Sequence, residues 1–281
     1  MCHIKNWVYS ETRKVQDQKS FEIAFPYLKE KLLVPFILIL SLLSLFQHSF
    51  AQSPDNKSVA NNFGGAVTVT NNGISFIPTF SLGKPAVIFD MAVGHKLTFE
   101  PQFRFSLKGK PWSFLFWWRY KVLGTDKFFF NTGAHLGLAY KTIGVSANGE
   151  TKDVQTVNRY LAAELSPNYG LTKNISIGVY YLYSRGIDPD ATRNTHFLTL
   201  NANFSDVKLS GQYYMKLVPQ VYYLRMNQYD GYYLTSSVTL AKRNSPFSIS
   251  GMFNKIIQTD ISASKNFVWN ASIVYRFNKK L

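Results

Sequence analysis

Three histidines and two neighbouring aspartates are the side chains in this sequence that suggest acid–base or metal chemistry. The histidines that follow residue 51 are His95, His135 and His196, and Asp188 and Asp190 flank a proline shortly before His196. Histidine can act as a general base for a serine, and carboxylates can bind a divalent cation. The Asp-Pro-Asp run is more typical of a turn, and the sequence has no zinc spacing, phosphate loop or Gly-x-Ser-x-Gly elbow. We therefore expect no catalytic residue, no metal site and no cofactor.

Several other charged side chains occupy alternate positions in apolar segments. In residues 97–107 every odd position is Leu, Phe or Pro, and every even position is Thr, Glu, Gln, Arg or Ser. Because side chains of a β-strand alternate between its two faces, this segment has one apolar, aromatic face and one charged face. The same alternation recurs in 111–122, 174–184 and 266–277. In 111–122 the apolar face is expected to carry Trp112 together with the aromatic residues at the other even positions, whereas Trp117 lies on the opposite face.

The polar faces of these strands are expected to line the lumen of a barrel. Charges in a confined interior either pair with one another or line a water-filled path. Basic residues outnumber acidic ones on these faces, which favours a path for anions. The candidate lumen-lining residues are Asp90, Glu100, Arg104, Arg119, Lys121, His135, Glu164, Lys216, Lys255 and Arg276. Trp117 and Phe197 are among the bulky residues expected to narrow the lumen.

The N-terminal part of the chain has the three regions of a secretory signal peptide. Lys29 and Lys31 precede an apolar run at 32–46, and Ser49-Phe50-Ala51 forms a small-x-small cleavage site. The run is shorter than the roughly 20 residues needed for a helix that spans a bilayer. Residues 1–51 are thus interpreted as an N-terminal extension and cleaved signal peptide. Residues 52–73, rich in Asn and Ser, are predicted to be a flexible periplasmic leader, and residues 74–281 the barrel.

Twelve strands are predicted in the barrel, and the long and short connections between them alternate from the fifth strand on. This rhythm is typical of transmembrane barrels with short periplasmic turns and longer extracellular loops. A soluble antiparallel barrel or sandwich would also alternate. The expected strands are 74–82, 86–94, 97–107, 111–122, 127–140, 159–169, 174–184, 196–204, 208–217, 231–241, 247–255 and 266–277. The fold class is therefore all-β, a transmembrane antiparallel up-and-down barrel.

Three segments carry a resemblance to an uncharacterised outer-membrane β-barrel family of the Bacteroidota. They are Leu82-Gly-Lys-Pro-Ala86, Leu97-Thr-Phe-Glu-Pro-Gln-Phe-Arg-Phe105 and Gly109-Lys-Pro-Trp-Ser-Phe-Leu-Phe-Trp-Trp-Arg-Tyr120. The last strand, Ala271-Ser-Ile-Val-Tyr-Arg-Phe277, resembles the aromatic-ended strand that the barrel assembly machinery reads. The resemblance implies the bacterial outer membrane as location and a barrel as fold, and it implies no activity.

The net charge of the chain limits the classes of partner that are expected. After residue 51 the chain keeps 25 Lys and Arg against 12 Asp and Glu, a net charge of +13. An exported chain rarely meets nucleic acid, so the expected partners are outer-membrane lipid and lipopolysaccharide, the assembly machinery during insertion, and small solutes. The sequence favours a narrow passive channel for small, anionic solutes. It leaves open a non-conducting structural or adhesive barrel with partner-binding loops at 141–158, 185–195 and 218–230, and, less favoured, an outer-membrane hydrolase.

Overall fold

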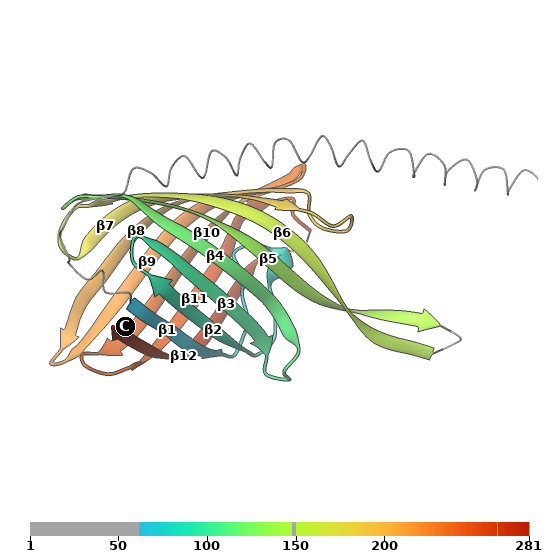
Figure 1. Cartoon of the computed structure of the whole chain (residues 1–281), viewed down its shortest axis with the longest axis horizontal. Helices are drawn as coiled ribbons and strands as arrows, with labels where there is room; N and C mark the ends of the chain where they lie inside the picture. Colours follow the sequence, from blue (N-terminus) through green and yellow to red (C-terminus); the bar gives the residue numbers. More distant parts are fainter. Residues whose placement is uncertain (1–61, 148–149, 263, 281) are drawn as a thin grey trace, which may run out of the picture. The chain divides into compact units, whose positions relative to one another are not determined.

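The described part of the chain is a closed barrel of twelve antiparallel strands (Figure 1). The computed structural model describes residues 62–147, 150–262 and 264–280. Each strand pairs with its neighbours along the chain, and β1 pairs with β12 to close the barrel. The elements are β1 (Asn62–Thr70), η2 (Pro78–Phe80), β2 (Ala86–Gly94), β3 (Leu97–Ser106), β4 (Pro111–Gly124), β5 (Phe128–Ala147), β6 (Glu150–Gly170), β7 (Ile175–Gly186), β8 (Asn194–Ser210), β9 (Tyr213–Met226), β10 (Tyr229–Lys242), β11 (Phe247–Thr259) and β12 (Phe267–Lys280).

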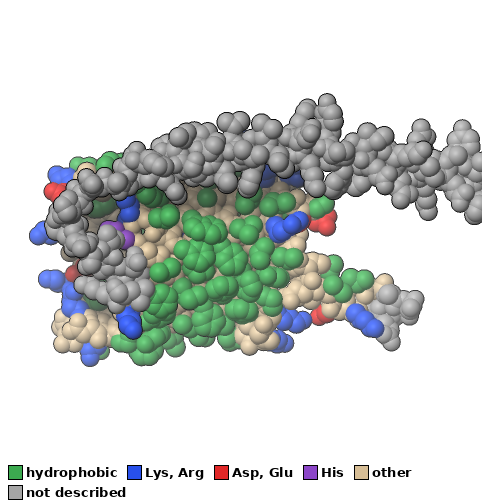
Figure 2. Space-filling view, viewed as in Figure 1, with side chains coloured by type: hydrophobic (Ala, Val, Ile, Leu, Met, Phe, Trp, Pro, Cys, Tyr) green, Lys and Arg blue, Asp and Glu red, His purple; other side chains and the backbone are tan. Residues whose placement is uncertain are grey.

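The outer surface of the barrel is apolar, and this decides between a membrane barrel and a soluble one. A band of aliphatic side chains such as Leu200, Ile249 and Ile273 is exposed on the outside. Figure 2 shows this apolar belt on one face, with Lys and Arg gathered towards both ends. Exposed aromatic residues of the outer face lie near one end (Tyr120, Phe128, Tyr169, Tyr213, Phe247, Tyr275) and near the other (Tyr232, Phe267, Trp269). An apolar band between two aromatic girdles is the pattern of a transmembrane barrel, so the predicted fold class is confirmed.

The two ends of the barrel differ in their connections. At one end, which we call the turn end, every connection is short: 95–96, 125–127, 171–174, 211–212 and 243–246. Both ends of the barrel chain lie there, since Asn62 pairs with Lys280. The opposite end, the loop end, carries 71–85, 107–110, 187–193 and 260–266, together with the β5–β6 hairpin and the tight turn 227–228. This asymmetry corresponds to the periplasmic and extracellular sides of outer-membrane barrels.

The first strand was predicted in the wrong place. The barrel starts at Asn62, inside the predicted leader, and the predicted strand 74–82 belongs to the connection 71–85 between β1 and β2. Strand β1 lacks a strong signal because Gly64 and Gly65 are poor strand formers. Gly65 is needed there: a Cβ at this position would lie 2.7 Å from Cζ of Phe277, whose ring covers it. Residues 1–61, with the predicted signal peptide, lie outside the described residues.

Two of the predicted loops are also strands. Residues 218–230 continue β9 and β10, which are joined by a tight turn at 227–228 with Asn227 at a φ of 56°. Most of 141–158 continues β5 and β6, whose hairpin extends beyond the neighbouring strands (Figure 1). The cause is the same in both cases: polar residues in these segments interrupt the apolar pattern, but the backbone pairs with the adjacent strand. Within the described residues, no helix is long and apolar enough to cross a membrane.

Candidate functional site in the barrel lumen

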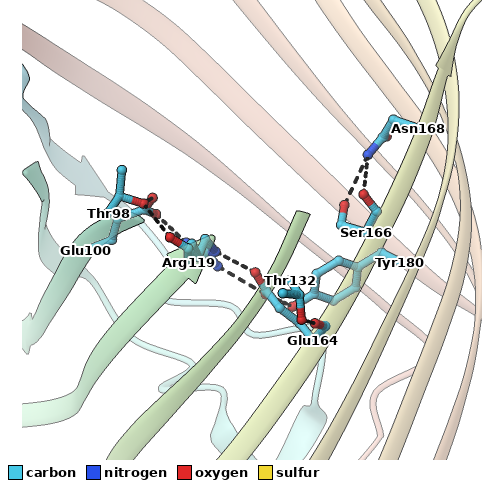
Figure 3. Close-up of polar contacts among 8 residues, drawn as sticks. All are labelled: Thr98, Glu100, Arg119, Thr132, Glu164, Ser166, Asn168 and Tyr180. Carbon is cyan, nitrogen blue, oxygen red and sulfur yellow. Dashed lines mark hydrogen bonds and ion pairs between the residues drawn. The ribbon is translucent and has the colours of Figure 1, made fainter. Parts of the chain in front are cut away.

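An ion-pair network crosses the inner wall of the barrel from β3 to β7 (Figure 3). Arg119 donates from Nε to Oε1 of Glu164 at 2.6 Å and from Nη2 to Oε2 at 3.3 Å. Its Nη1 contacts Oε2 of Glu100, whose Oε1 accepts a hydrogen bond from Thr98 at 2.7 Å. The Tyr180 hydroxyl donates to Oε2 of Glu164 at 2.7 Å. One guanidinium is thus shared by two carboxylates, and Glu164, 3% exposed, has its charge compensated by a complete set of donors.

The network depends on a glycine in the strand between its members. In the register of the sheet Arg119 pairs with Gly133, and Gly133 pairs with Glu164. A Cβ on Gly133 would lie 3.0 Å from Cγ of Arg119 and 3.1 Å from Oε1 of Glu164. Because β5 has no side chain at this point, Arg119 of β4 reaches across it to β6.

Arg104 has no such carboxylate partner. Its Nη2 donates to Oε1 of Gln102 at 2.9 Å, and its guanidinium lies 5.4 Å from the ring centre of Trp112. Its buried Nε has no hydrogen-bond partner among the described residues. Asp90 interacts with it electrostatically, but no ion pair joins the two in the described part of the chain. Arg104 is therefore the lumen cation best placed to receive an acceptor from outside the protein.

His135 lies on the same wall as the two arginines. Its ring centre is 4.2 Å from that of Trp117, and its buried Nδ1 has no hydrogen-bond partner among the described residues. The Arg119 guanidinium lies over the same Trp117 ring, 4.2 Å from its centroid. No serine is hydrogen-bonded to His135 in the described residues.

The connection 71–85, which we call the inserted loop, folds into the barrel from the loop end. The Phe76 ring lies 5.9 Å from that of Phe197 and 6.0 Å from that of Tyr222, and the Phe80 ring lies 4.8 Å from that of Tyr160. Two hydrogen bonds fasten the loop to the wall. Tyr222 donates from its hydroxyl to the Phe76 carbonyl at 3.3 Å, and Trp112 donates from Nε1 to the Phe80 carbonyl at 2.7 Å.

The position of Trp112 differs from the one predicted from the sequence. The sequence places it on the lipid face, but it is buried and faces the inserted loop. The β3–β4 register shifts between Arg104 and Phe105, which leaves Trp112 as the extra residue of a bulge. A bulge interrupts the alternation of faces at one position, and here it turns the indole inward.

A cavity of about 640 Å³ remains in the lumen beside the inserted loop. Along β6 and β7 its lining extends from Tyr160 and Ser184, near the loop end, to Asn168, near the turn end. The cavity is lined by the charged Arg104 and Arg119, by His135 and by the phenols of Tyr160 and Tyr180, and no carboxylate lines it within the described residues. Amides and hydroxyls of Gln102, Ser166, Asn168, Thr199, Asn201, Asn203 and Gln220 supply the other polar surface.

The predicted lumen residues fall into three groups. Arg104, Arg119 and His135 line the cavity, and Glu100 and Glu164 bind Arg119 behind it. The alternation of their strands places Asp90, Lys121, Lys216 and Arg276 on the inner face but away from the cavity, and Arg276 donates to the Ser248 hydroxyl at 2.5 Å. The prediction is wrong for Lys255. Its neighbour Asn254 faces inward, so Lys255 lies on the outer face together with Phe253 and Ile257.

Sequence reasoning missed the inserted loop, which contributes Phe76, Ile77 and Phe80 to the cavity wall. A signal was present: residues 74–82, Ile-Ser-Phe-Ile-Pro-Thr-Phe-Ser-Leu, do not alternate strictly, and a proline stands in their middle. Proline inside a run argues against a paired strand. Within the described ranges, no group of three or more His, Cys, Asp and Glu side chains is close enough to hold a metal ion.

Comparisons with known proteins yield similarity to solved barrels only. No family model and no curated protein matches the chain. The KdgM porin in complex with disordered oligogalacturonate is 10% identical and has a TM-score of 0.47, covering 77% of this chain and 99% of its own. The NanC porin (11%, TM-score 0.43) covers 77% and 99%, and the β domain of the Bordetella autotransporter BrkA (10%, TM-score 0.43) covers 78% and 99%. At these identities, each comparison concerns the backbone and assigns no activity to this chain.

Proposed function

We propose that this protein is a narrow passive channel of the bacterial outer membrane for small solutes. The observation that carries the proposal is the lumen cavity, whose lining runs along β6 and β7 from near the loop end to near the turn end. Amide and hydroxyl groups along this wall can replace part of the hydration shell of a passing solute. The inserted loop narrows the path, so only small solutes are expected to pass.

We further propose that the channel prefers anions. Arg104 supports this preference because it faces the cavity without an ion-paired carboxylate in the described residues. Arg119 contributes less, since Glu100 and Glu164 compensate its charge. The selectivity is thus assigned mainly to Arg104, assisted by Lys121, Lys216 and Arg276 on the inner face of the turn end.

Planar bilayer recordings on the purified protein under a salt gradient test both statements. Small stable current steps with an anion-selective reversal potential are expected. Arg104→Gln should shift the reversal potential towards that of a non-selective pore, whereas Lys108→Gln, the same charge change in the exposed β3–β4 turn, should leave it unchanged. A wild-type reversal potential that is not anion-selective would overturn the anion preference, and an anion-selective one that is equal in all three proteins would overturn its assignment to Arg104. Silence from inserted, folded barrels would overturn the channel.

A non-conducting barrel is the second candidate, and one observation favours it. Phe76 and Ile77 of the inserted loop pack against a buried cluster that includes Trp117, Phe197 and Tyr222. If this cluster seals the lumen, the wild-type protein will be silent in bilayers and removal of the Phe76 ring will produce current. The exposed connections at the loop end would then be the sites for partners.

A further inference from the structure

Polar groups cross the outer surface of four adjacent strands near the loop end. Tyr183, His196, Arg225 and Asp230 pair directly with one another in the sheet register, from β7 to β10. They face outward, because each shares the alternation of exposed residues on its own strand, such as Leu198 and Val221. We call these four residues the outer polar row. Each lies within three residues of the end of its strand, where a membrane interface is expected.

Together with Arg185, the outer polar row holds two arginines against the one carboxylate of Asp230, a net charge of +1. Arg225 is exposed, and its Nε donates to the Asn227 carbonyl at 3.2 Å. Arg185, two residues beyond Tyr183 on the same face of β7, is exposed as well. Neither arginine forms an ion pair within the described ranges, in contrast to Arg159 and Arg243. The Asp230 carboxylate is engaged by the Tyr223 hydroxyl at 3.1 Å.

An apolar groove of about 290 Å³ adjoins this row on the lipid-facing surface. Leu198, Tyr223 and Tyr232 line it, and each is two residues along the same strand face from a member of the outer polar row. The other lining residues are Val179, Thr199, Leu200, Val221, Tyr222, Tyr233 and Ile257. For comparison, an apolar cavity of about 150 Å³ holds a benzene molecule, so this groove accommodates a longer hydrocarbon segment.

From these two features we infer a binding site for a phosphorylated lipid of the membrane leaflet at the loop end. The guanidinium groups of Arg185 and Arg225 bind the phosphate, with which arginine forms paired, charge-assisted hydrogen bonds. One acyl chain lies in the groove and is held by its contacts with Val179, Leu200 and Val221. A soluble anion would use the arginines alone, whereas a lipid uses the arginines and the groove together. This inference is independent of whether the lumen conducts.

Native mass spectrometry of the purified barrel in detergent tests the site. The probe is a synthetic, acylated diglucosamine lipid with two phosphates, compared with its dephosphorylated form and with the phosphorylated sugar that lacks acyl chains. The phosphorylated lipid is expected to remain bound, and the other two to bind at least about tenfold more weakly, since the dephosphorylated lipid lacks the charge-assisted hydrogen bonds and the sugar lacks the apolar contacts in the groove. Equal retention of the lipid with and without phosphate would overturn the inference.

Two variants and one control locate the binding. Arg185→Gln combined with Arg225→Gln should weaken binding of the phosphorylated lipid about tenfold or more. Val221→Trp, which fills the groove, should weaken it without a change in charge. Lys242→Gln removes an outward-facing cation from the same wall at the turn end and should have no effect. Loss of binding in the control alone, or unchanged binding in both test variants, would show that the lipid binds elsewhere. Circular dichroism verifies that each variant is folded.

Discussion

Arg119 and Glu164 pair at 2.6 Å across an intervening strand, and they meet because Gly133 leaves the space between them empty. Neither residue is adjacent to the other in sequence or in strand order. The pair joins β4 to β6 on the inner wall and, through Glu100 and Tyr180, extends to β3 and β7. The polar inner wall is thereby fixed in one arrangement beside the cavity.

Removal of Glu164 should destabilise the barrel. Glu164→Gln leaves Arg119 with one carboxylate in place of two, and breaking a buried ion pair costs about 3–5 kcal/mol when the remaining charge has no other partner. Because Glu100 remains, we expect about 2 kcal/mol, measured by denaturant unfolding in detergent micelles. Asp153→Asn, at the exposed pair with Lys110, serves as the control and should change stability by less than about 0.5 kcal/mol. Equal effects of the two substitutions would contradict the proposed role of the network.

Filling the space at Gly133 should break the same pair without removing a charge. A Cβ at this position would contact the Trp118 carbonyl at 2.9 Å as well as Arg119 and Glu164. Gly133→Val is therefore expected to lower the free energy of unfolding by about 2 kcal/mol or more, by overpacking and by loss of the pair. Gly124→Ala, where the nearest atom is 3.9 Å away, is the matched control and should be neutral. A stable Gly133→Val protein with unchanged selectivity would argue against this account.

The inserted loop should limit conductance. Phe76→Ala removes the ring that stacks on Phe197 and packs edge-on against Tyr222, which widens the lumen beside the cavity. We expect larger current steps than in the wild type, together with a loss of about 3 kcal/mol of stability, as is usual for a truncated Phe in a packed site. Leu107→Ala, in the exposed β3–β4 turn, should alter neither quantity. Smaller or unchanged current steps in Phe76→Ala would place the constriction elsewhere.

The connection 187–193 should loosen in acid. The Arg159 side chain donates hydrogen bonds to Asp188, at 2.6 Å from Nη2 to Oδ1, and this lowers the pKa of the Asp188 carboxyl below its usual value of 3.8. A carboxyl whose pKa is depressed in the folded state contributes stability above its unfolded pKa and loses it as the pH falls through the folded value. The connection should thus stay ordered down to about pH 4 and become mobile below that.

A nitroxide label measures this transition, since no cysteine follows Cys2 in the sequence. With the label at Ala191→Cys, its mobility should rise only below about pH 4 in the wild-type background. Asp188→Asn should make the label mobile at neutral pH, whereas Asp190→Asn should not. A label that is equally mobile at pH 7 in all three proteins would show that the Arg159–Asp188 pair does not hold the connection.

The sequence by itself determined which face of most strands meets lipid and which meets the lumen. The alternation in β3, β7 and β12 is a local, period-two signal, and the exposed Leu97, Val179 and Trp269 follow it. Eleven of the twelve strands followed from the same signal, whereas the membrane class rested on the signal peptide, the aromatic richness and the alternation of long and short connections. Of the ten lumen candidates, Arg104, Arg119 and His135 were recognised as charged or polar residues of the inner face without knowledge of their partners.

Only the tertiary structure decided the features that depend on pairing between distant segments. Strand β1 closes the barrel by its pairing with β12 and β2. Its Gly64-Gly65 part has little strand propensity of its own, although the following run Val67-Thr-Val-Thr70 is β-branched. The inward turn of Trp112 depends on a register shift. The outward position of Lys255, in contrast, follows from the local alternation that it shares with Phe247, Ile249 and Phe253 and could have been read from the sequence. The Arg119–Glu164 pair requires an empty position on a third strand. Local periodicity does not encode register, so these contacts appear only when the sheet is closed.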